Sequence, residues 1–167
     1  MGIRKAYTKD MKFARALPAP SPRSDTAKKV AWIYAAVLVI MVVGQLFSFE
    51  KFIPLIAGYW LPGGNGATTL LAGLIVVSEV FALPFLLRMP LSPLMRWFSL
   101  GCGLVAAVLW VILGVIAVVS DNAMTNSGIL GTKVTVPSDG AQLLWAVVLG
   151  VLAVWSAWGL WPADRKK

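Results

Sequence analysis

The acidic residue Glu79 lies near the middle of an almost wholly apolar stretch, GLIVVSEVFALPFLLR, at residues 73–88. An ionised carboxylate is costly in hydrocarbon, so this side chain either keeps its proton or contacts a polar partner. Helical spacing places Ala72 and Ala82 on the same face, and small residues are typical of contacts between membrane helices. We therefore expect Glu79 to face other helices, either as neutral interhelical glue or as a group that handles a ligand or a proton.

Four other residues near the apolar runs carry usable polar groups. The first apolar run contains Gln45 near its end and is followed by Glu50 and Lys51, and the third run contains Trp110. Together with Glu79 they form the predicted ligand-binding or proton-handling set. Lys51 reaches Glu79 only if it turns inward and lies deep, because Glu79 is expected about 15 Å below the outer surface at about 1.5 Å of rise per residue.

Several kinds of chemistry lack the residues that they need. The chain contains no histidine, which excludes histidine-ligated metal or haem and a Ser-His-Asp triad. Cys102 is the single cysteine, so intramolecular disulfide exchange within this chain is excluded. The glycine cluster in LPGGNGATT lacks the lysine of a phosphate-binding loop. We predict no catalytic residues, no metal site and no covalent cofactor.

The composition is that of an integral membrane protein. Of the 167 residues, 59% are hydrophobic and 13% are charged. Four apolar runs cover residues 30–48, 69–87, 97–119 and 142–161. About 20 helical residues cross the hydrocarbon core of a bilayer, and a backbone in lipid must satisfy its own hydrogen bonds. The fold class predicted is all-α, a four-transmembrane-helix antiparallel bundle in contact with the lipid bilayer.

The basic residues predict the orientation. Thirteen of the fifteen lysines and arginines fall in the two terminal segments and the loop between the second and third runs. The positive-inside rule then places both termini in the cytoplasm of a multi-pass protein in the cell (inner or plasma) membrane. The net charge of +8 is interpreted as an orientation signal rather than as a nucleic-acid-binding surface.

The chain divides into one membrane domain and two tails. Residues 1–29 are predicted to be a disordered basic cytoplasmic tail, 30–161 the four-helix domain, and 162–167 a second basic tail. In the polar loop between the third and fourth runs, TKVTV at residues 132–136 is β-branched and suggests a short strand.

Residues 30–90 resemble the DoxX/MauE-like family of small four-helix membrane proteins. The resemblance is carried by Gly44, Lys51, Phe52, the turn at residues 59–62, and Glu79. It implies a membrane subunit or partner of thiol-, sulfur- or quinone-linked redox enzymes, with Lys51 and Glu79 as the polar signature. The long basic N-terminal segment and the polar loop after the third run depart from the family pattern.

The functional hypothesis is an accessory subunit of a redox system, with no complete catalytic set of its own. Glu79, assisted by Lys51, would polarise or protonate a quinone-like or small thiol ligand. The expected partner is a membrane or membrane-associated redox protein, and self-association stays open. Two alternatives remain: a small proton-coupled transporter of lipophilic cations that uses Glu79, and a structural scaffold in a larger membrane complex.

Overall fold

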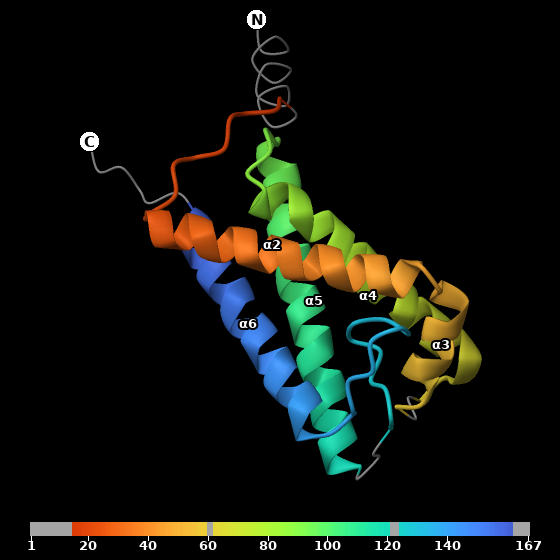
Figure 1. Cartoon of the computed structure of the whole chain (residues 1–167). Helices are drawn as coiled ribbons and strands as arrows, with labels where there is room; N and C mark the ends of the chain where they lie inside the picture. The colour runs from red at the N-terminus through yellow and green to blue at the C-terminus, as the bar shows by residue number, and fades with distance from the viewer. Residues whose placement is uncertain (1–14, 60–61, 121–123, 162–167) are drawn as a thin grey trace, which may run out of the picture.

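The computed structural model of the chain contains five helices among the residues that it describes, which are 15–59, 62–120 and 124–161 (Figure 1). The helices are α2 (Asp25–Leu46), α3 (Phe49–Ala57), α4 (Gly64–Leu86), α5 (Pro93–Val119) and α6 (Gly140–Leu160). All but α3 are long and apolar enough to cross a membrane. The prediction of an all-α four-helix membrane bundle is confirmed.

Local sequence signals set where the long helices begin. Ser24 caps α2 by accepting from the Ala27 amide at 3.1 Å, and Asp139 caps α6 by accepting from the Ala141 amide at 2.8 Å. These polar caps lie before the apolar runs, so each long helix begins two to five residues earlier than predicted from hydropathy. The ends at residues 46, 86, 119 and 160 lie within two residues of the predictions.

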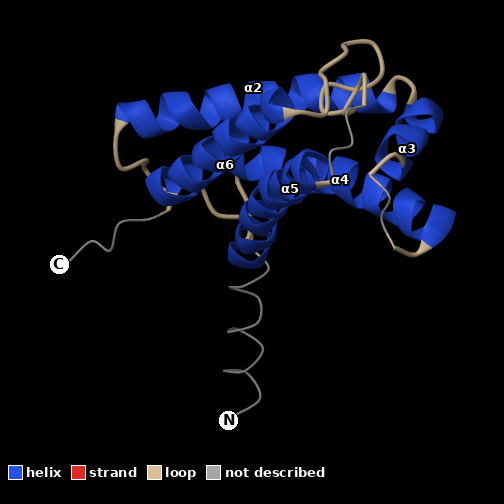
Figure 2. Ribbon diagram, turned by 90° about the horizontal axis from the view of Figure 1, so that it is seen from below, coloured by secondary structure: helices blue, strands red, loops and turns tan. Residues whose placement is uncertain are grey.

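The four long helices pack in a ring. Helix α5 contacts α4 and α6, and α2 closes the ring by contacting α6 and α4. Figure 1 shows α2 crossing the others at a steep angle, and Figure 2 shows it lying along one side of the bundle. The Tyr34 hydroxyl spans the ring from α2 by donating to the Gly103 carbonyl of α5 at 2.8 Å. Large apolar side chains such as Ile40, Leu70 and Val154 are exposed on the outside, as contact with lipid requires.

A serine of α5 repairs the backbone of α4 near Pro84. The Phe85 amide donates to the Ser99 hydroxyl at 3.0 Å, and this hydroxyl donates in turn to the Phe81 carbonyl at 2.5 Å. The hydroxyl is thus inserted between a donor and an acceptor that would be bonded directly in a regular helix. This contact fixes α4, which carries Glu79, against α5.

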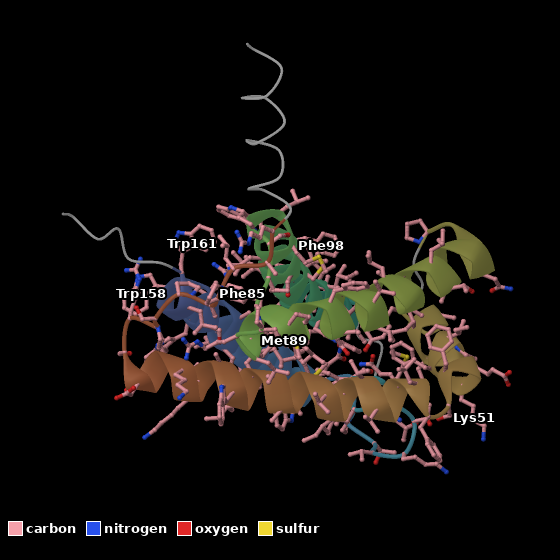
Figure 3. The ribbon with its side chains drawn as sticks, turned by 90° about the horizontal axis from the view of Figure 1, so that it is seen from above. Lys51, Phe85, Met89, Phe98, Trp158 and Trp161 are labelled. Carbon is pink, nitrogen blue, oxygen red and sulfur yellow. The ribbon has the colours of Figure 1, made fainter. Side chains whose placement is uncertain are left out.

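Helix α3 lies inside a segment predicted only as a loop. Its short sequence is amphipathic, and Phe52 and Ile56 are fully buried whereas Glu50 and Lys51 are exposed. The helix packs chiefly on α4. Figure 3 shows Lys51 at the opposite end of the molecule from Trp158 and Trp161. We call the end with α3 the loop end, and the end with Trp158 and Trp161 the basic end.

The segment 124–139 folds back into the bundle at the loop end. Figure 1 shows it turning from α5 toward α2 and α3 before α6 begins. Its two limbs are joined by backbone hydrogen bonds, from Ser127 to Val136 at 2.7 Å and from Ser138 to Met124 at 3.0 Å. Ile129, at the turn, is 1% exposed. The strand prediction for 132–136 is wrong, because within the described residues this run forms turns and bends around the buried Ile129.

The basic end is crossed by a segment that was predicted to be part of a disordered tail. We call residues 17–23 the strap. Leu17 and Leu91 exchange two backbone hydrogen bonds of 3.1 and 3.2 Å, and the Arg23 amide donates to the Gly159 carbonyl at 2.9 Å. The strap thereby joins the α4–α5 connection to the end of α6. Residues 1–14 and 162–167, the rest of the predicted tails, lie outside the described residues.

Candidate functional site

Glu79 is completely buried in the bundle, where neutral donors surround it. Its Oε1 atom accepts from the indole Nε1 of Trp110 at 2.8 Å and from the amide Nε2 of Gln45 at 3.4 Å. These donors come from α5 and α2, so the carboxyl group links three helices of the ring. Its other oxygen, Oε2, has no hydrogen-bond partner among the described residues.

The hydrogen bonds of Glu79 differ between its two oxygens, Oε1 and Oε2. A charged carboxylate in hydrocarbon requires a cation or several donors, whereas the partners seen at Glu79 are two neutral N–H groups on one oxygen. In the neutral acid the proton would sit on Oε2, the oxygen that accepts no hydrogen bond, and would make it a donor; among the described residues this atom has no partner.

Gln45 connects this carboxyl group to the folded-back loop. Its Nε2 atom also donates to the Ile129 carbonyl at 3.4 Å, while its buried Oε1 atom has no partner in the ranges that the structure describes. Within the described part of the chain, the site thus leaves two buried oxygens without partners, Oε2 of Glu79 and Oε1 of Gln45. Buried polar atoms normally have partners, so a pair left open in this way is the pattern of a place that receives a ligand or water.

The loop is seated on α2 through two glycines. A Cβ atom at Gly131 would overlap the backbone of Gly44, and Gly131 itself has φ of +79°, a region that glycine adopts at low cost. Next to them the hydroxyls of Ser48 and Thr132 form a hydrogen bond. This close approach to α2 covers part of the backbone of the loop.

A second group of buried polar side chains lies along the same loop. The Tyr59 hydroxyl, 2% exposed, donates to the Ser127 carbonyl at 2.9 Å. Burial raises the pKa of this hydroxyl above its ordinary value, although the nearby Gln142 and Ser127 side chains act in the opposite direction, so it stays a donor. The Gln142 amide is fully buried and makes no hydrogen bond of regular geometry with the described residues.

The structure brings together three of the five predicted site residues. Glu79, Gln45 and Trp110 meet in one hydrogen-bonded cluster, as described above. Glu50 and Lys51 instead lie exposed on α3 and do not join it. The segment packs on the bundle, which was the condition for an inward Lys51, but Phe52 and Ile56 are the residues that it buries. The role of Lys51 at Glu79 therefore has no support in the geometry.

Sequence reasoning missed Ser127, Ile129 and Gln142. Gln142 carried a signal, because it is a polar residue in the first turn of an apolar helix. The glycines at 128 and 131, both with positive φ, were a weaker signal for a tightly folded loop. Among the described residues no group of three or more His, Cys, Asp or Glu side chains is placed to hold a metal ion.

Comparisons with known proteins give no match to this chain, whether against protein-family models, curated proteins or solved structures. The DoxX/MauE-like resemblance therefore stays a prediction, and the functional argument rests on the geometry of the site.

Proposed function

We propose that the chain binds the hydrogen-bonding head of a quinone-like molecule at the Glu79–Gln45 site and serves as a membrane accessory subunit of a thiol-, sulfur- or quinone-linked redox system. One observation carries the proposal: two buried oxygens, Oε2 of Glu79 and Oε1 of Gln45, have no partner among the described residues. In the neutral acid Oε2 is a donor, whereas the Gln45 oxygen is an acceptor. A quinone carbonyl can accept a hydrogen bond from the Glu79 hydroxyl, and a quinol hydroxyl can donate one to the Gln45 oxygen.

The role of Glu79 in this proposal is to polarise, not to transfer electrons. Its hydroxyl donates to a ligand oxygen, while the Trp110 indole and the Gln45 amide hold the opposite oxygen in place. Electrons would come from the partner enzyme, since the chain supplies no redox group of its own. In the proposed orientation both termini lie on the cytoplasmic side of the plasma membrane. Thirteen of the fifteen basic residues lie in the two terminal segments and in the connection between α4 and α5.

The site is closed by the segment 124–139, so ligand entry requires this loop to move away from α2. The touching hydroxyls of Ser48 and Thr132 mark a place for a reversible lock. In a Cys102→Ala background, the pair Ser48→Cys and Thr132→Cys should form a disulfide and block quinone binding. Reduction should restore the binding, whereas equal binding in both redox states would contradict entry past this loop.

The binding test is a titration of the detergent-solubilised protein with a short-chain ubiquinone analogue, followed by quenching of tryptophan fluorescence. Glu79→Gln replaces the acid with a weaker donor and should weaken binding about 2- to 10-fold, the value of one hydrogen bond. Glu79→Leu should abolish binding. Glu50→Gln removes an exposed carboxylate on α3 and should bind like the native chain. Equal binding by all four proteins would refute the site.

A liposome experiment separates this function from transport. A proton-coupled exporter would move lipophilic cations in exchange for protons that flow down an imposed pH gradient. Glu79→Gln would stop this flux, because protons and cations compete for one carboxylate. We expect no such flux. Purification from the native membrane should bring down an oxidoreductase, whereas a stable complex without quinone binding would favour the scaffold function.

A further inference from the structure

A recess at the basic end is lined by two arginines and by apolar side chains. It lies where the strap crosses the connection between α4 and α5. The apolar residues that line it are Phe85, Met89, Leu91 and Leu160, and the arginines are Arg88 and Arg96. Figure 3 shows Phe85 and Met89 toward the end of the molecule that carries Trp158 and Trp161. The volume of the recess is only about 10 Å³, so a ligand headgroup would lie at its mouth rather than inside it.

Arg88 occupies a backbone position that normally favours glycine. Its φ of +58° ends α4 in a hydrogen-bond pattern in which the Arg88 amide donates to Phe85 at 3.1 Å and the Met89 amide to Pro84 at 3.0 Å. A non-glycine residue costs about 1 kcal/mol or more in this conformation. We therefore expect the Arg88 side chain to make an interaction that offsets this conformational cost.

The guanidinium of Arg88 is only partly satisfied by protein. One terminal nitrogen donates to the Pro20 carbonyl of the strap at 3.0 Å, but Nε is buried and has no partner among the described residues. Arg96 beside it donates from one terminal nitrogen to the carbonyls of Leu17 and Pro18, at 3.3 and 3.2 Å. Each guanidinium has five N–H donors, so donors remain on both side chains.

The charged and aromatic side chains around the recess favour an anionic ligand near the membrane–water interface. The described residues of the basic end include six basic side chains and one acidic side chain, and these are Arg15, Arg23, Lys28, Lys29, Arg88, Arg96 and Asp25. Trp97 and Trp161 lie with ring centroids 4.2 Å apart, and Arg23 lies 4.9 Å over the Trp158 ring. Tryptophans of this kind mark the interface between membrane and water.

We propose that this recess binds the phosphate of an anionic phospholipid, with Arg88 and Arg96 as its ligands. Guanidinium groups bind phosphate oxygens through paired N–H donors, and both arginines have N–H groups beyond those that bond the strap. The apolar side chains beside the arginines favour a lipid over free phosphate, because an acyl chain can pack on them and an inorganic ion cannot. The bound lipid joins the strap to the connection between α4 and α5.

The test is the thermal unfolding of the full chain in a non-ionic detergent with added phosphatidylglycerol, phosphatidylcholine or inorganic phosphate. Phosphatidylglycerol should raise Tm, and the other two additions should leave it unchanged. Native mass spectrometry should show one retained phosphatidylglycerol. Phosphatidylcholine also carries a phosphate, but its choline cation leaves no net charge, so an equal rise with it would overturn the selection of an anionic headgroup. An equal rise with inorganic phosphate would overturn the lipid as ligand.

Two variants keep the test separate from misfolding. Arg88→Gly suits the positive φ and removes the guanidinium, while the strap keeps its backbone bonds through Leu17 and Arg23. It should stay folded and lose most of the Tm rise and the retained lipid. Lys29→Gln removes one exposed positive charge from the same end and should keep both. A full Tm rise in Arg88→Gly, or an equal loss in Lys29→Gln, would show only diffuse attraction and would refute the site.

Discussion

The substitution Gly131→Ala should separate the folded-back loop from α2. Gly131 has φ of +79°, and an alanine in this region costs about 1–2 kcal/mol. The added Cβ would also overlap backbone atoms of Gly44 and lie 2.9 Å from the backbone nitrogen of Gln45. Backbone atoms of a packed helix cannot rotate away, so overpacking adds about 1–3 kcal/mol. We expect Gly131→Ala to lower the free energy of unfolding by about 2–5 kcal/mol.

The chain offers a matched control at Gly64. Its φ is +65°, and an added Cβ would have no atom within 4 Å, so Gly64→Ala carries the conformational cost alone. Both variants should be unfolded reversibly in mixed micelles of mild detergent and dodecyl sulfate, with the helical circular dichroism signal followed. Gly131→Ala should be less stable than Gly64→Ala by about 1–3 kcal/mol. Equal losses would refute the close seat of the loop on α2.

Three further predictions address other parts of the fold. Gly44→Ala should destabilise the bundle, because its Cβ would meet the Leu130 carbonyl, whereas Gly73→Ala has open space and should gain up to about 1 kcal/mol of helix propensity in the same unfolding assay. Tyr59→Phe should cost about 0.5–1.5 kcal/mol by removing the donor to a loop carbonyl, and an unchanged stability would contradict that buried bond. With the native cysteine replaced, a cysteine at the exposed Asn65 should react with an impermeant thiol reagent from outside intact cells, and one at Ser21 should not; the reverse labelling would invert the topology.

The long helices were predictable because their causes are local. A run of about 20 apolar residues can be read along the chain for each of the four helices, and polar caps at Ser24, Ser92 and Asp139 precede three of them. The inward face of Glu79 was predictable for the same reason, since helical periodicity places Ala72 and Ala82 beside it. The contact between Glu79 and Trp110 followed no local rule, because it depends on how α4 and α5 are rotated against each other.

The loop end was not predictable because its structure depends on distant contacts. The polar composition of 124–139 favours an exposed loop, yet the backbone is covered through Gly131 on Gly44 and through Gln45 on Ile129. The amphipathic pattern of α3 allowed either Lys51 or Phe52 to turn inward. Packing decides in favour of Phe52, because a buried aromatic ring needs no charge compensation.

The hydrogen bond from the Glu79 hydroxyl to a bound quinone can be observed by ligand-induced infrared difference spectroscopy of the detergent-solubilised protein. A protonated carboxyl group has a C=O band separate from those of carboxylates and amides. We predict such a band in the native chain and in Glu50→Gln, shifted when the ubiquinone analogue is added, and missing in Glu79→Gln. A native spectrum without a Glu79-dependent band, or with one that the quinone leaves in place, would contradict the proposed site.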